Sequence, residues 1–151
     1  MPVKTAVLAM TVLAVCFPYP SRLAAHIDHW RDPDALIQPD ALALQPMLTE
    51  VRSMLSTLEP IMIDPGSSNG ALKIVERYVY QKIPYKYDWI TWGTVDYLPT
   101  VTEVIEKGHE DCDGRAVVAA SLLKGLGYDA SSVCAFDSCA PRKAMSSAIR
   151  V

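Results

Sequence analysis

The stretch EKGHEDCDGRA, residues 106–116, places Cys112 between two acidic residues. Glycine and small apolar residues follow, so Cys112 is predicted to lie in the first turn of a helix, where unpaired backbone N–H groups and the helix dipole favour the thiolate. Asp111 and Asp113 oppose this effect because they add negative charge. Cys112 is therefore a candidate nucleophile for attack on an acyl carbonyl, and an inert structural cysteine is the alternative.

A second hypothesis treats the cysteines as metal ligands. The pattern H-x2-C followed by C-x4-C is compatible with a tetrahedral zinc site of three thiolates and one imidazole, with the ligands His109, Cys112, Cys134 and Cys139. A helix after Cys112 would carry the chain about 20 Å away before the second pair, so the tail would have to run back. A disulfide between Cys134 and Cys139 is simpler and leaves Cys112 as a thiol. His26 and His29 have no third ligand nearby, so we expect no metal and no cofactor.

The composition limits the class of function. The chain has 151 residues, of which 50% are hydrophobic and 21% charged, and this balance is typical of one globular domain. Its 14 basic and 17 acidic residues give a net charge of −3, without a basic cluster that would attract phosphate backbones. We expect no nucleic-acid partner.

The first residues differ from the rest of the chain. Lys4 precedes an apolar run from Thr5 to Phe17, which is shorter than the ~20 residues that a membrane-spanning helix needs. Residues 1–25 are therefore predicted to be a signal peptide, and the protein to be exported to the periplasm, the extracellular space or a membrane surface. An uncleaved apolar anchor, associated with a membrane, is the alternative.

Three segments are expected after residues 1–25. Residues 26–66 are predicted to be a helical segment that leads into the domain. Its helix is expected over 47–58, and the stretch before that helix, from Ser21 to Pro46, is expected to be ordered but irregular. A domain follows over residues 71–136, with a helix over 71–83 that ends before Pro84. The last stretch, residues 137–151, has no coherent pattern and is predicted to be an irregular tail.

Two helices are predicted to position Cys112. The first is a short helix from Val101, with Thr100 as N-cap, Glu103 completing a capping box and Gly108 at the C-terminal left-handed turn. An aromatic-rich stretch without periodicity, residues 84–99, precedes it and is predicted to be a loop. The second helix starts at Cys112 and is apolar nearly all round, which predicts a central, buried position. Residues 128–136 after it are predicted to form a strand.

The stretches ALKIVERYVYQKIPYKYD and YLPTVTEVIEKGHEDCDGRAVVAASLLKGLGYDA, between Ala71 and Ala130, resemble the N-terminal half of a transglutaminase-like domain, which has the papain-like cysteine fold. The resemblance implies an α+β fold, with a mostly helical first half and an incomplete sheet. It also implies that Cys112, in DCDGRA, is the nucleophile. The implied chemistry is acyl transfer, or amide or peptide hydrolysis, through a thioester on a protein or peptide substrate.

The sequence departs from this family after the central helix. In the family a histidine and then an aspartate on downstream strands activate the cysteine, but this chain has no histidine after His109. A cysteine with a pKa of about 8.5 is only a few per cent thiolate at neutral pH. We therefore expect a truncated domain that is weakly active or inactive. The alternative is a small exported binding module, with a structural zinc or disulfide and no catalysis.

Overall fold

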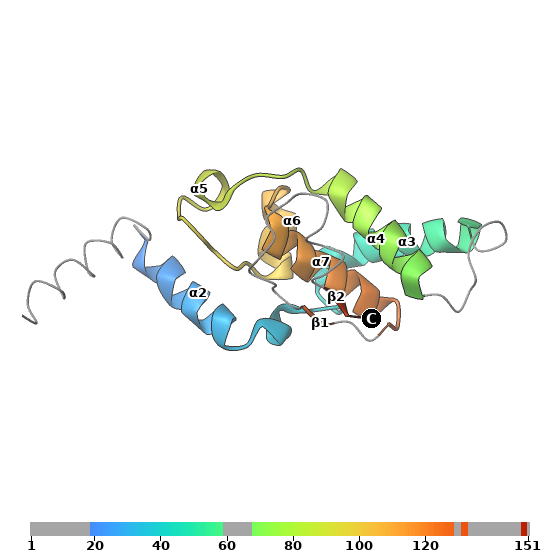
Figure 1. Ribbon diagram of the computed structural model, residues 1–151, viewed down its shortest axis with the longest axis horizontal. Coiled ribbons are helices and arrows are strands. Elements are labelled where there is room, and N and C mark those ends of the chain that lie inside the picture. The colour runs from blue at the N-terminus through green and yellow to red at the C-terminus, as the bar shows by residue number, and fades with distance from the viewer. Residues whose placement is uncertain (1–18, 59–67, 129–130, 133–148, 151) are drawn as a thin grey trace, which may run out of the picture.

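A buried helix, α7 (Cys112–Gly125), forms the centre of the fold (Figure 1). The structure is a computed structural model that describes residues 19–58, 68–128, 131–132 and 149–150. All ten residues from Gly114 to Leu123 are buried, as the apolar sequence of this helix predicts. Because small residues such as Ala116, Ala119 and Ala120 alternate with valine and leucine, neighbouring helices can approach closely on every side.

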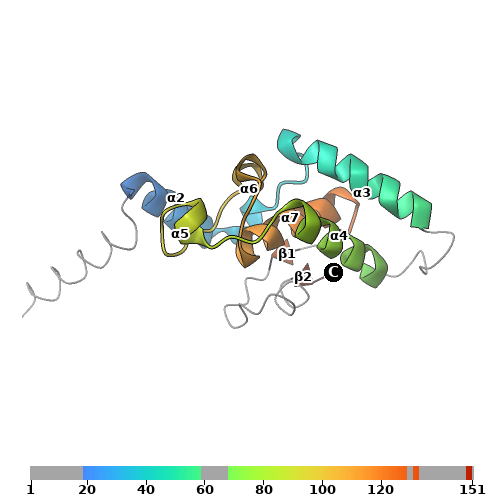
Figure 2. The same ribbon diagram turned by 90° about the horizontal axis from the view of Figure 1, so that it is seen from above.

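Three helices pack on α7: α3 (Gln45–Leu58), α4 (Ser68–Lys82) and α6 (Val101–Lys107). Two views at right angles show α4 and α6 beside α7 (Figures 1 and 2). The predicted helices over 47–58 and 71–83 are confirmed: the observed helices start two and three residues earlier, and the second ends one residue earlier. The core between the helices contains fully buried aliphatic side chains, among them Val51, Val75, Val79, Val104, Val117 and Leu122.

The predicted ends of α6 are confirmed. The Glu103 backbone N–H donates to the Thr100 hydroxyl, and the Glu103 carboxylate accepts from the Thr100 backbone N–H at 2.8 Å, which completes the capping box. Gly108 closes the helix with a φ of 69°, a left-handed conformation that suits glycine. These two ends fix where α6 stops and where the loop to Cys112 begins.

The prediction of an irregular stretch from Ser21 to Pro46 is wrong for the first part of that stretch. Helix α2 (Pro20–Arg31) occupies this part, and the 3-10 helices η1 (Pro33–Leu36) and η2 (Leu42–Leu44) follow. Pro20 stands in the first turn of α2, where a missing N–H costs nothing. The helix has no buried residue, so it lacks the apolar period that would have revealed it.

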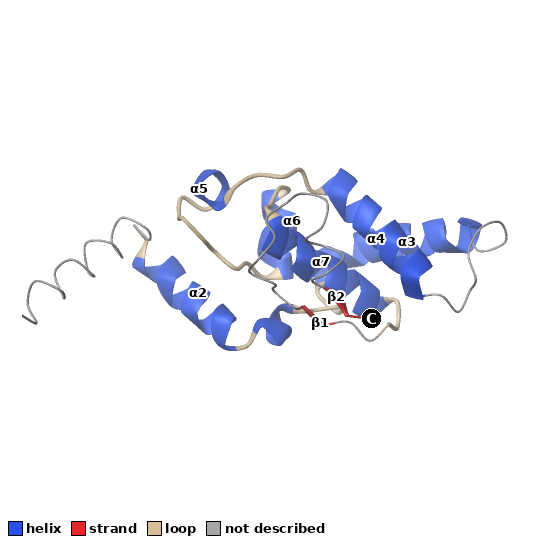
Figure 3. Ribbon diagram, in the orientation of Figure 1, coloured by secondary structure: helices blue, strands red, loops and turns tan. Residues whose placement is uncertain are grey.

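The expected α+β class is also wrong, because the described part of the chain is helical (Figure 3). Its extended pairing is limited to a short antiparallel contact between β1 (Ser131–Ser132) and β2 (Ile149–Arg150) and one isolated parallel bridge between Tyr85 and Glu110. The strand predicted over 128–136 is described only at 128 and 131–132. The physical reason for the correction is that α3, α4 and α6 cover α7, so helices occupy the place expected for a sheet.

The aromatic stretch is mostly irregular, as predicted, but contains one helical turn, α5 (Asp88–Thr91). Among the described helices, none combines the length and the apolar character needed to cross a membrane. The predicted signal peptide lies outside the described residues, apart from Tyr19 and the start of α2. Residues 59–67, which include part of the predicted linker, also lie outside them.

Candidate functional site

Cys112 is the first residue of α7, as predicted, and its side chain is half-buried. The residue before it, Asp111, has an extended backbone and serves as N-cap without a side-chain capping bond. The thiol therefore lies at the positive end of a helix that has a buried interior behind it. A helix N-terminus favours the thiolate form of a cysteine.

A buried cation, Arg115, follows Cys112 by one helical turn. Its Nε donates to the Ile83 carbonyl oxygen at 2.8 Å, and its Nη2 donates to the same oxygen. The guanidinium lies over the rings of Tyr80 and Tyr85, 5.0 and 5.2 Å from their centroids. Burial lowers the pKa of Arg115, while the nearby tyrosines, Asp111 and Cys112 act in the opposite direction. The sequence analysis missed this residue, whose positive charge favours a thiolate at Cys112.

His109, a ligand in the zinc hypothesis, belongs to a different contact. Its Nδ1 lies 3.1 Å from the Thr91 hydroxyl oxygen, at the end of α5. Partial burial lowers the pKa of His109, and the positive charges of Lys86 and Lys107 lower it further. The imidazole is therefore neutral at physiological pH. The other two proposed zinc ligands, Cys134 and Cys139, lie outside the described residues.

Four carboxylates surround the start of α7. One oxygen from each lies within 4.8 Å of the others, and the four residues are Asp88, Glu110, Asp111 and Asp113. Asp88 and Glu110 are buried, with 2% and 0% of their surface exposed. A bridge between Tyr85 and Glu110 brings the segment before α5 to the segment before α7, through the Glu110 N–H to Pro84 carbonyl bond at 3.1 Å.

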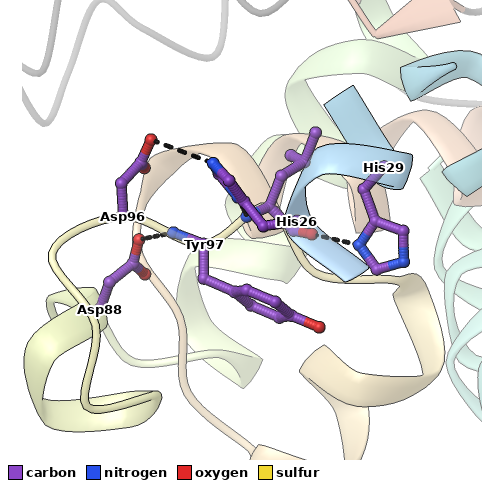
Figure 4. A network of polar contacts seen from close by, with 6 residues as sticks. His26, His29, Asp88, Asp96 and Tyr97 are labelled. Atoms are coloured by element: carbon purple, nitrogen blue, oxygen red, sulfur yellow. Dashed lines mark hydrogen bonds and ion pairs between the residues drawn. The ribbon is translucent and has the colours of Figure 1, made fainter. Parts of the chain in front are cut away.

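Backbone and indole donors hold the two buried carboxylates. Trp92 Nε1 donates to Glu110 Oε2 at 2.7 Å, and the Asp111 backbone N–H donates to Glu110 Oε1 at 2.9 Å. Asp88 Oδ2 accepts from the Tyr97 backbone N–H at 2.7 Å (Figure 4). Asp88 thus fixes the loop after α5, while Glu110 fixes the turn that leads to Cys112.

These carboxyl groups retain protons more strongly than isolated ones. Burial raises the pKa of Asp88 to about 9 and that of Glu110 to about 7, and it raises the pKa of Asp113 as well. The negative charge of Asp111 acts in the same direction on all three. Around Cys112, the thiolate is therefore opposed by the ionised acids and favoured by Arg115 and the helix end.

His26 and His29 both hydrogen-bond to the backbone of Leu98, in the loop between α5 and α6 (Figure 4). His26 Nδ1 accepts from the Leu98 N–H at 3.1 Å, and His29 Nδ1 donates to the Leu98 carbonyl at 2.6 Å. His26 Nε2 lies 3.9 Å from Asp96 Oδ2. This pair of histidines docks α2, and neither contact involves the region of Cys112.

The acidic cluster is the part of the site that sequence reasoning missed. From the sequence, Asp111 and Asp113 are only charges and ordinary capping residues beside the thiol, and Asp88 lies in the aromatic stretch with no motif to connect it to them.

Comparison with protein families, with curated proteins and with solved structures finds no match to this chain.

Proposed function

We propose that Cys112 is the nucleophile of a transglutaminase-like protein that acts on a protein or peptide substrate, and that its activity in this chain is weak or absent. The observation that carries this proposal is the position of the thiol, half-buried at the first residue of a helix whose next turns are buried. The resemblance of DCDGRA and its flanking helices to that family supports the same role.

The chemistry would proceed in two steps. The Cys112 sulfur attacks the carbonyl carbon of a glutamine side-chain amide or a peptide bond, and a C–S bond forms. The C–N bond then breaks, and the leaving ammonia or amine takes the proton that the thiol gave up. Water or an amine attacks the resulting thioester, which releases the acyl group and restores the thiol. Backbone N–H groups in the first turn of α7 would be the donors that stabilise the oxyanion.

We expect low activity because the histidines, the side chains best suited to accept a proton from a thiol at neutral pH, are engaged in other contacts. The three histidines of the chain make hydrogen bonds elsewhere: His26 and His29 bond to Leu98, and His109 bonds to Thr91. Arg115 favours the thiolate but, as a cation, cannot accept a proton.

Acylation by an activated ester tests the role of the thiol. The folded chain is treated with p-nitrophenyl acetate, and each cysteine-containing peptide is then examined by mass spectrometry. We expect slow acylation at Cys112, with Cys112→Ser as the control that loses this adduct. The proposal fails if Cys112 remains unmodified while acetylation occurs at Cys134 or Cys139.

The pH dependence of alkylation tests the expected weakness. The rate of iodoacetamide labelling at Cys112, measured from about pH 5 to 9, should rise only near the range of an ordinary thiol, around pH 8.5. A midpoint well below pH 7 would show an activated thiolate and would contradict the low activity. His109→Ala and Arg115→Met would then identify the activating group.

A further inference from the structure

The helical turn α5 carries exposed apolar side chains on its outer side. Asp88 and Thr91 are buried, so the two residues between them, Trp89 and Ile90, are left 58% and 59% exposed. Single exposed apolar side chains are ordinary, but a group of them marks a contact with another molecule or with a membrane. We call this surface the aromatic face, and it consists of Tyr87, Trp89 and Ile90.

The aromatic face is ordered by contacts between its own rings. The rings of Tyr87 and Trp89 stack with their centroids 4.2 Å apart and their planes 9° from parallel. Tyr85 meets the Tyr87 ring edge-on at 5.3 Å. Side chains that are already held in place lose less entropy when a partner binds. Tyrosine and tryptophan also combine an apolar ring with a polar group, which suits them to the boundary between hydrocarbon and water at a membrane surface.

We propose that the aromatic face inserts into the surface of a lipid bilayer, so that the folded domain lies on the membrane. This contact differs from the N-terminal anchor considered above, because it is made by side chains of the domain that follow residue 86. It is also independent of the chemistry proposed for Cys112, since no step of that chemistry involves Trp89 or Ile90.

The path of the chain brings an apolar segment to the same place. The run from Thr5 to Phe17 ends shortly before Tyr19. The Tyr19 ring lies beside Gly93, just after α5, because a Cβ atom at Gly93 would be 3.5 Å from Tyr19 Cε2. The start of α2 lies next to α5 in both views (Figures 1 and 2). A bilayer that takes up residues 5–17 would therefore meet the aromatic face as well.

The charges around α5 suit anionic headgroups. Arg22 and Lys107 lie over the ring of Trp92, the C-cap of α5, at 5.6 and 5.1 Å from its centroid. Lys86, which is exposed, directly precedes the aromatic face. The exposed acids of α6 and of the loop before it are Asp96 and Glu106. These three cations outnumber the two acids, and basic residues beside an apolar surface strengthen binding to anionic lipid.

Sedimentation with vesicles tests the proposal on the full chain. The vesicles are phosphatidylcholine with about 30% phosphatidylglycerol, which supplies the anionic surface. We expect the wild type to bind, and Trp89→Ser and Ile90→Ser each to bind roughly tenfold more weakly, because each removes one apolar side chain from the contact. Leu42→Ser is the matched control: Leu42 is 90% exposed, lies in η2 outside the aromatic face, and should be dispensable for binding.

Quenching by brominated lipids locates the contact within the chain. Bromine atoms on the acyl chains quench only those tryptophans that reach the hydrocarbon, and the chain has three tryptophans. We expect quenching in the wild type, its loss in Trp89→Phe and its retention in Trp30→Phe. Trp89→Phe keeps an aromatic ring and should still sediment with the vesicles, so the loss of the reporter is separated from the loss of binding.

Three outcomes would overturn the proposal. The wild type does not bind the vesicles; or Trp89→Ser and Ile90→Ser bind as the wild type does, so that residues 5–17 alone hold the protein on the bilayer. The third is a dimer in analytical ultracentrifugation that Trp89→Ser dissociates, in a protein without vesicle binding, because a second copy would then cover the aromatic face. Circular dichroism reports whether each variant folds, and if one serine variant does not, the other and the wild-type quenching decide.

Discussion

The change of Gly114 to alanine is a sharp test of the packing around the site. A Cβ atom at Gly114 would lie 2.2 Å from Glu110 Cγ, 2.8 Å from Pro99 Cγ and 3.0 Å from Val104 Cγ2. The Pro99 ring is rigid, and Glu110 cannot turn away because both of its carboxylate oxygens accept hydrogen bonds. The glycine therefore allows close approach by the protein's own side chains.

Two effects oppose each other in this variant. Alanine in a helix interior is favoured over glycine by about 1 kcal/mol. Overpacking a filled core costs about 1–3 kcal/mol, and a contact of 2.2 Å, far inside the ordinary 3.5–4.0 Å, places Gly114 at the upper end of that range. The net expectation is a loss of about 2 kcal/mol in the free energy of unfolding, or a fall in Tm of roughly 4–8 °C.

Urea denaturation followed by tryptophan fluorescence measures this loss. Gly125→Ala is the matched control, because it lies in the same helix and its Cβ would meet only the flexible end of Leu48, at 3.0 Å. We expect Gly125→Ala to remain close to the wild type. If Gly114→Ala were as stable as the wild type or more stable, the close packing between α7 and the loop before it would be refuted.

Three further predictions concern single hydrogen bonds, each measured by urea denaturation. Thr100→Ala should lose about 1 kcal/mol because the capping box is broken, whereas Thr100→Ser should not. Burial lowers the pKa of His26 in the folded protein, so the unfolded chain binds this proton more readily, and the free energy of unfolding should fall as the pH drops below about 6.5. His26→Asn keeps an acceptor for the Leu98 N–H and should remove this part of the pH dependence. An unchanged dependence of stability on pH in His26→Asn would contradict the reasoning. Trp92→Phe should cost about 1–3 kcal/mol and raise the pKa of Glu110 further, since the buried carboxylate loses a donor; a neutral effect would show that the bond does not matter.

Helices with an apolar period or a capping signal could be predicted from sequence. The central helix at Cys112 and the box of Thr100 with Glu103 are local patterns, and the structure has both. Helix α2 could not be predicted in this way because it has no fully buried residue and is attached largely through hydrogen bonds to a loop about 70 residues away. Its residues carry no sign of that partner.

The acidic cluster shows the same limit within the site. Asp111 and Asp113 are visible beside Cys112, but Asp88 joins them only because the bridge at Tyr85 and Glu110 brings two segments together. The sheet was expected from a family resemblance and not from the residues themselves, whose only strand signal was the weak stretch 128–136. In the described part of the chain, helices α3, α4 and α6 cover α7 in place of the expected sheet.

The hydrogen bonds from the two histidines of α2 to the Leu98 backbone have a consequence for how α2 is attached to the rest of the protein. Since one imidazole saturates the amide and the other the carbonyl of the same fully buried residue, they act together as a neighbouring strand would. Losing either contact loosens the backbone that the other one holds. The two hydrogen bonds therefore support each other, and because Trp30 of α2 also packs against the hydrophobic core, separating this helix would expose hydrocarbon as well as peptide groups.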